Sequence, residues 1–111
     1  MAKGKIEPRV RVPKRAKKGD IIEIKTLIKH PMESGERRRK DGSRIPRMII
    51  NKFEVTYNGV QVFLSDWHAA MSSNPFLTFH IVAQKSGMLN FKWTDDSGGV
   101  FTKSANIIII E

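Results

Sequence analysis

Apolar and polar residues alternate along most of this chain with a period of two, which is typical of β-strands. The clearest alternating runs are DIIEIKTLIKH from position 20, INKFEVTYNG from 50, VQVFL from 60, FLTFHIV from 76 and MLNFKWT from 88. A weaker run, PRVRV, starts at position 8, and the last run is VFTKSANIIII from 100. No run has the 3.6-residue period of an amphipathic helix, so the pattern predicts an all-β protein with about seven strands.

Each run places its apolar residues on one face of the expected strand. These faces predict the core residues Ile22, Ile24, Thr26, Ile28, Phe53, Val55, Tyr57, Leu77, Phe79, Ile81, Leu89, Phe91 and Trp93. In the run from 60, the alternating face consists of Val60, Val62 and Leu64.

Turn signals separate the runs. Asn58-Gly59 joins two of them directly and predicts a type I′ hairpin, while Gly19-Asp20, Ser86-Gly87 and the segment 95–99 mark further reversals. About seven short strands in 111 residues are typical of an immunoglobulin-like antiparallel β-sandwich. We expect one such domain over residues 19–111, preceded over 1–18 by a basic arm that includes the first strand.

Several strands are also apolar on the opposite face, which a small sandwich leaves uncovered. One interpretation is a protein–protein interface, and the other is a cover made by loops or by the N-terminal arm. The residues of this predicted partner interface are Ile21, Leu27, Phe76, Val82, Ile108 and Ile110.

The charge of the chain is uneven. The net charge is +9, of which residues 1–18 contribute +7 and residues 33–47 contribute +3, so the rest sums to −1. Nucleic-acid binders usually spread their cations along a groove or a helix face, so a basic arm and a basic loop fit that class less well. No apolar run approaches the length of a membrane span, and no membrane contact is expected. The N-terminus has no apolar segment of a secretory signal peptide.

Candidate chemistry is sparse. The chain has no cysteine, which excludes disulfides, thiolate metal sites and covalent sulfur chemistry on its own residues. His30, His68 and His80 are not spaced as metal ligands, and His30, before Pro31 at a strand end, is expected in solvent. Asp95-Asp96 lies in a glycine-rich turn that offers too few further oxygens for calcium. We therefore predict no catalytic, cofactor or metal site; a metalloenzyme on this fold remains the alternative that metal content would reveal.

The segment HPMESGERRRKDGSRIP, residues 30–46, carries the main charge cluster of the body. It can be a solvated loop, a phosphate-binding site, or a docking surface for an acidic protein. Binders of single-stranded nucleic acid interleave aromatic and basic residues, and residues 30–52 contain no aromatic residue except His30. Docking is therefore favoured, and a nucleic-acid-binding β-domain using the arm and the 37–47 loop is the alternative. The predicted docking residues are His30, Pro31, Met32, Glu33, Arg37, Arg38, Arg39, Lys40 and Asp41.

The motifs LIKHPMESGERRRKDGSRIPRMII, YNG, Trp67 and SSNPFLTF occur in this order. Together they resemble the SoxZ family, the small subunit of the SoxYZ sulfur-carrier complex of thiosulfate oxidation. The resemblance covers roughly residues 20–110. It implies an immunoglobulin-like domain that pairs with a SoxY-like subunit, whose cysteine on a flexible glycine-rich arm carries the pathway intermediates.

The resemblance also implies a scaffold rather than an enzyme. A SoxZ-like chain supports the carrier subunit and makes transient contacts with the thiosulfate-oxidising enzymes, without a cofactor of its own. No nucleic-acid partner is implied, and the isolated chain can form a homodimer. We further expect a periplasmic location, reached by co-export with the partner, since this chain shows no signal peptide of its own.

Overall fold

In this computed structural model, residues 6–68 and 73–111 are described, and they form eight β-strands and no helix. The all-β prediction is confirmed, with one strand more than the seven expected. The strands are β1 (Pro8–Arg11), β2 (Arg15–Lys17), β3 (Ile21–Ile28), β4 (Ile50–Tyr57), β5 (Val60–Asp66), β6 (Phe76–Val82), β7 (Gly87–Asp95) and β8 (Val100–Ile110).

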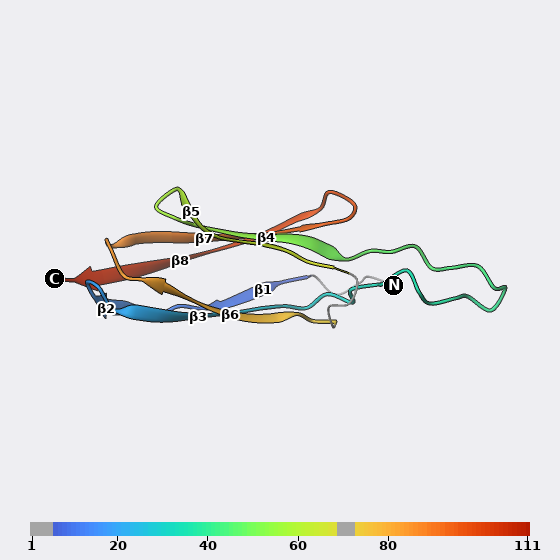
Figure 1. Cartoon of the computed structure of the whole chain (residues 1–111), viewed down its shortest axis with the longest axis horizontal. Helices are drawn as coiled ribbons and strands as arrows, with labels where there is room; N and C mark the ends of the chain where they lie inside the picture. Colours follow the sequence, from blue (N-terminus) through green and yellow to red (C-terminus); the bar gives the residue numbers. More distant parts are fainter. Residues whose placement is uncertain (1–5, 69–72) are drawn as a thin grey trace.

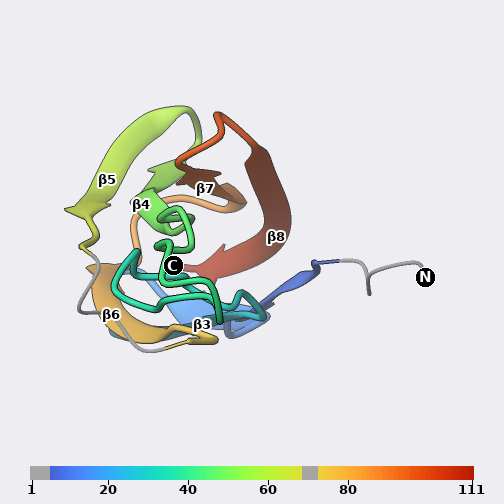
Figure 2. The ribbon, with the colours of Figure 1, turned by 90° about the vertical axis from the view of Figure 1, so that its right-hand side faces the viewer.

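The strands form two facing sheets, as expected for an immunoglobulin-like sandwich (Figures 1 and 2). One sheet has the order β1-β3-β6, and the other has the order β2-β8-β7-β4-β5. All pairings are antiparallel except that of β2 with β8. The segment 8–17, part of the predicted basic arm with the first strand, adds β1 to one sheet and β2 to the other.

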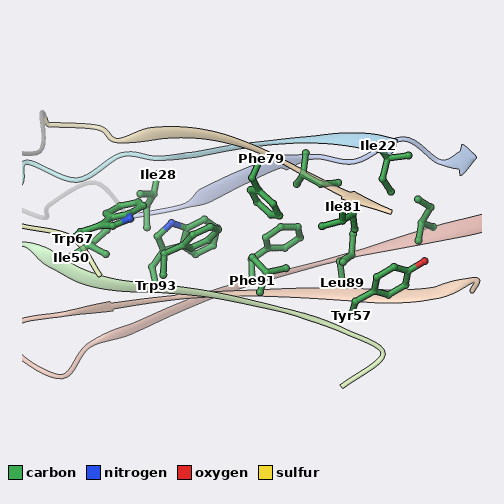
Figure 3. Packing of buried hydrophobic residues seen from close by; sticks show 14 of the residues in the cluster. Ile22, Ile28, Ile50, Tyr57, Trp67, Phe79, Ile81, Leu89, Phe91 and Trp93 are labelled. Atoms are coloured by element: carbon green, nitrogen blue, oxygen red, sulfur yellow. The ribbon is translucent and has the colours of Figure 1, made fainter. Parts of the chain in front are cut away.

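The core fills the space between the sheets with the predicted inward faces (Figure 3). Phe53 lies at its centre, with its ring centroid 4.9 Å from that of Trp93 and 6.2 Å from that of Phe79. Ile24, Val55 and the other predicted residues are buried, except Leu77, which is partly buried. Alternation along single strands predicted these residues because each sheet has only one covered face. The core also contains residues that the alternating faces did not predict, namely Met32, Ile49, Ile50, Trp67, Ala83 and Ile107.

Strand β5 departs from the simple alternation. A β-bulge between Val55 and Thr56 shifts the register, so Phe63 pairs with Val55 and packs on the core. The rings of Phe63 and Phe79 stack at 4.5 Å and connect the two sheets. Val60, Val62 and Leu64 are exposed instead. A bulge depends on the partner strand, so the sequence of β5 alone did not predict it.

The Asn58-Gly59 turn has the predicted conformation. Both residues have positive φ, 50° for Asn58 and 83° for Gly59, which a type I′ turn requires. The Asn58 side chain also accepts a hydrogen bond from the backbone N–H of Met88, at 3.0 Å, and so ties the hairpin to the start of β7.

A long hairpin projects from one end of the sandwich, between β3 and β4 (Figure 1). The molecule measures 62 × 27 × 19 Å along its principal axes, and this hairpin lies along the long axis. Among the described residues, no helix is long and apolar enough to cross a membrane.

Candidate functional site

The projecting hairpin, residues 33–48, contains most of the predicted docking residues, and we call it the basic finger. Backbone hydrogen bonds close it along its length. Glu33 and Met48 exchange two bonds at the base, at 2.9 and 2.8 Å, and the N–H of Ile45 donates to the carbonyl of Arg37 at 2.9 Å. The N–H of Arg39 donates to the carbonyl of Ser43 at 2.7 Å near the tip. The segment is therefore an ordered two-stranded hairpin.

The turn residues of the finger explain its shape. Gly42 has a φ of 89°, a conformation that glycine adopts without strain. Asp41 accepts hydrogen bonds from the N–H and the hydroxyl of Ser43, at 2.9 and 2.6 Å. The hydroxyl bond, with the backbone bond, lowers the pKa of Asp41, so this carboxyl stays ionised at neutral pH.

The returning strand of the finger is anchored by Asp96 in the β7–β8 turn. Its two carboxylate oxygens accept hydrogen bonds from Nε and Nη2 of Arg47, both at 2.9 Å. They also accept from the N–H of Ile49 at 3.1 Å and from Nδ2 of Asn51 at 3.0 Å. Partial burial alone would raise the pKa of Asp96, but the bonds from Asn51, Ile49 and Arg47 outweigh it and lower the pKa.

The outgoing strand is anchored by His30, which we expected in solvent. This expectation is wrong, since His30 is only 3% exposed. Its Nδ1 accepts a hydrogen bond from the N–H of Met32 at 3.0 Å, and its ring meets that of Phe101 edge to face. The backbone N–H of His30 donates to Oδ1 of Asn74 at 2.9 Å, and the carbonyl of His30 accepts from the backbone N–H of Asn74 at 2.7 Å. Burial lowers the pKa of His30, although Asp95 and Asp96 act in the opposite direction.

The tip of the finger carries the accessible charge. Arg38, Arg39, Lys40 and Arg44 are all exposed. None of these four forms an ion pair with a carboxylate in residues 6–68 or 73–111. Arg38 donates to the carbonyl of Gly42 at 2.8 Å, which leaves other donors of its guanidinium free. The tip of the finger thus carries four cations and one carboxylate, that of Asp41.

The remaining predicted docking residues divide into two groups. Arg37 pairs with Glu33 within the finger, and this bond lowers the pKa of Glu33 and raises that of Arg37. Pro31 is exposed, whereas the side chains of His30 and Met32 are buried and act as anchors. The charged side chains that are accessible to a partner therefore lie in the outer half of the finger.

The predicted interface residues lie on strands of the sandwich, and the pair Leu27 and Phe76 is at the end of β3 and β6 that adjoins the base of the finger. Ile21 is 74% and Phe76 59% exposed, and Val82, Ile108 and Ile110 are also exposed. Leu27 is partly buried. Whether a partner covers these positions stays a prediction.

The described residues contain no group of three His, Asp or Glu side chains that could hold a metal ion. His80 lies on the outer face of its sheet, with Nε2 3.7 Å from a Glu23 carboxylate oxygen, and His68 is exposed. Oδ1 of Asp95 accepts bonds from the Ser97 N–H and hydroxyl and from the Gly99 N–H, at 3.0, 2.7 and 2.8 Å. Asp95 therefore shapes the turn, and Asp96 holds the finger.

The residues of this site outside the predicted docking set include Arg44, Asn74 and Asp96. Arg44 belongs to the tip because the hairpin returns past Arg38, to which it is bridged. Asn74 and Asp96 are far from the finger in sequence, and neither lies in a local pattern that indicates an anchor. The charged run indicated the tip, whereas Asn74, in the SSNPFLTF motif, and Asp96, in the glycine-rich turn, gave no signal for an anchoring role.

The two sheets and the finger define a small immunoglobulin-like β-sandwich protein with a projecting basic hairpin. A family model described as "Sulphur oxidation protein SoxZ" matches residues 10–106, most of the chain. The chain belongs to this family, and the resemblance seen in the motifs is confirmed. Membership supports a role in the sulfur-oxidation carrier complex. A search of curated protein sequences finds no match.

Solved structures with the same fold include two reductases and a sulfur carrier. The superoxide reductase (neelaredoxin) of Ignicoccus hospitalis aligns over 94% of this chain and 80% of its own, with a TM-score of 0.73 and 17% identity. A putative superoxide reductase of Thermotoga maritima aligns over 94% and 86%, with a TM-score of 0.72 and 16% identity. The sulfur carrier protein SoxY of Chlorobium limicola f thiosulfatophilum aligns over 97% and 88%, with a TM-score of 0.65 and 10% identity. At these identities the likeness concerns the fold alone.

Proposed function

We propose that this chain is the non-catalytic scaffold subunit of a thiosulfate-oxidising carrier complex. It pairs with a SoxY-like subunit that bears the reactive cysteine, and its basic finger docks the enzymes that act on the carrier. The family match over residues 10–106 is the observation that supports this proposal most strongly.

The chemistry of the chain fits a supporting role. It has no cysteine, so a sulfur intermediate bound through a thiolate belongs on another subunit. The charged groups at the finger tip are arginines, a lysine and an ionised carboxylate, which suit recognition of charged surfaces. Arginine in particular can bind a carboxylate through two parallel hydrogen bonds.

The finger is well placed for transient docking. It projects along the long axis and carries its exposed cations at the tip, away from the sandwich (Figures 1 and 2). Exposed charges accelerate the encounter with an oppositely charged protein, and the attraction weakens as salt screens it. We therefore propose that the docking surfaces of the pathway enzymes are acidic.

Replacing Arg38, Arg39, Lys40 and Arg44 with serine tests this role. At low salt, we expect thiosulfate-dependent cytochrome reduction to slow by about tenfold, because steering is lost, while the heterodimer stays intact. The matched control replaces four exposed cations elsewhere, Lys14, Lys18, Lys92 and Lys103, which removes the same charge. An unchanged rate in the finger variant, or an equal loss in the control, contradicts a docking role for the finger.

We also propose that the chain reaches the periplasm bound to the SoxY-like subunit. Membership of the SoxZ family supports this route. Cell fractionation checks it: the chain should disappear from the periplasm when the partner's export signal is deleted. A periplasmic chain without the partner contradicts co-export.

A further inference from the structure

The four terminal strands of the two sheets differ in how they are protected. An exposed sheet edge presents unpaired backbone N–H and C=O groups, and proteins commonly block such edges with charged residues and proline. Strands β1 and β2 carry this protection, with Pro8, Arg9, Arg11, Arg15 and Lys17. Strands β5 and β6 contain no lysine, arginine or proline. Both lie on the same side of the sandwich (Figure 2), and neither has a further strand beyond it among residues 6–68 and 73–111.

Strand β5 is the more open of the two. It ends the five-stranded sheet, and its outer side has no neighbouring strand within the part of the chain that the structure describes. Val60, Val62 and Leu64 are exposed, and its one charged residue, Asp66, is at the end. An edge strand of seven residues with three exposed apolar side chains is a template for another strand.

A groove adjoins the first half of this strand. It has a volume of about 370 Å³, and Val60 and Val62 contribute apolar side chains to it. The hydroxyl of Tyr57 donates to the carbonyl of Lys85 at 2.5 Å, which connects the β4–β5 hairpin to the loop after β6. The complete lining is Tyr57, Asn58, Val60, Val62, Gln84 and Lys85.

We propose that the free edge of β5 is a strand-addition site. An extended strand of the SoxY-like carrier subunit pairs with Val60–Asp66 and places an apolar side chain in the adjoining groove. In such sites the backbone hydrogen bonds provide affinity and the side-chain pocket provides specificity. The identity of the partner rests on the proposed function, whereas the open edge and the groove are features of this chain.

Charge favours a different chain over a second copy as the occupant. Two copies with a net charge of +9 each repel one another, whereas a neutral or acidic partner does not. Lys85 lines the groove, so a carboxylate next to the apolar anchor of the added strand completes the match.

The outer face of the three-stranded sheet fits this partner less well. Its apolar pairs Ile21 with Val82 and Leu27 with Phe76 lie at opposite ends of the paired strands β3 and β6. Between these pairs, the carboxylate oxygens of Glu23 lie 3.5 Å from Nζ of Lys25 and 3.7 Å from Nε2 of His80. Because charged groups divide the apolar surface, this face has no continuous patch of the kind that marks a docking site.

Amide hydrogen exchange on the complex with the carrier subunit tests strand addition directly. We expect those amides of residues 60–66 that do not bond to β4 to exchange at least about tenfold more slowly in the complex than in the isolated chain at low salt, because new backbone bonds protect them. Val62→Lys should weaken the complex by at least about tenfold, since it puts a charge in an apolar contact. Val100→Lys, on the similarly exposed Val100 of β8, is the matched control and should bind normally.

The outcomes separate the two proposals. A stable complex with unprotected β5 amides and normal binding by Val62→Lys overturns strand addition and leaves the scaffold function in place. Protection of β5 in the isolated chain that grows with its concentration also overturns it, because the occupant is then a second copy. Failure to form any complex with the carrier subunit overturns both proposals.

Discussion

At the scale of single residues, His30 shows how a contact distant in sequence changes the chemistry of a side chain. It follows strand β3 and precedes a proline, a position that predicts solvent exposure. Instead, His30 is buried: its N–H donates to the side chain of Asn74, and its ring packs edge to face against Phe101. Its Nδ1 accepts a hydrogen bond from the N–H of Met32. Burial favours the neutral imidazole, so its pKa is lowered from the ordinary value of 6.5.

This shift predicts a pH dependence of stability. Because the folded pKa lies below the unfolded one, the unfolded chain takes up a proton first as the pH falls. The contribution of His30 is complete above pH 6.5 and is lost as the pH drops through the folded pKa. The free energy of unfolding, measured with urea between about pH 8 and pH 5, should therefore decrease toward low pH. His30→Asn, which cannot titrate in this range, should show a flatter profile, and equal slopes would contradict the assignment.

At the scale of elements, the finger depends on an anchor outside itself. Asp96 gathers four hydrogen bonds from residues at or near the returning strand of the finger, whereas backbone pairing holds the two finger strands together. The anchor thus fixes the direction of the finger relative to β4.

Asp96→Asn should loosen this anchor. We expect a loss of about 2 kcal/mol of unfolding free energy at neutral pH, because charge-assisted bonds become weaker or unsatisfied. The pKa of Asp96 is lowered in the folded chain, so its contribution is present above the unfolded pKa and is lost as the pH falls through the folded pKa. The difference between the two proteins should consequently shrink in acid.

Urea unfolding at several pH values measures this difference, and amide exchange of residues 33–48 reports on the finger. Asp66→Asn, at the exposed end of β5, is the control for loss of one carboxylate. Equal effects of the two substitutions would show that Asp96 is no special anchor.

At the scale of the whole molecule, charge and apolar surface occupy different places. The exposed cations of the finger are at one end along the long axis, while the exposed apolar side chains of β5 lie along the side of the sandwich (Figures 1 and 2). The two surfaces therefore suit two contacts at once, a stable one with the carrier subunit and a brief one with an enzyme.

This separation predicts different responses to salt. The association rate with a pathway enzyme should fall by about tenfold as salt rises from about 0.02 M to about 0.5 M, because screening shortens the reach of the finger charges. The variant with serine at the four tip cations should show a much flatter dependence in stopped-flow measurements. The affinity for the carrier subunit should change little in either protein, because burial of apolar surface does not depend on charge. A carrier complex that dissociates in salt would contradict this division.

The sequence by itself determined most of the strands, their inward faces except that of β5, and the family. Alternation of apolar side chains is a local property of each strand, so Phe53, Phe91 and Trp93 were assigned to the core without knowledge of their neighbours. The Asn58-Gly59 turn is equally local, since both residues tolerate positive φ.

Only the tertiary structure decided which charges are free, which histidine is buried and which sheet edge is open. Arg47 and Arg38 look alike in sequence, yet Arg47 is paired because Asp96, which lies 49 positions later, folds against it. Likewise, the bulge in the β4–β5 pairing depends on how the strands pair, and so does the absence of a strand beyond β5 among the described residues. Such features depend on residues that meet only when the chain folds, and no pattern within one segment contains them.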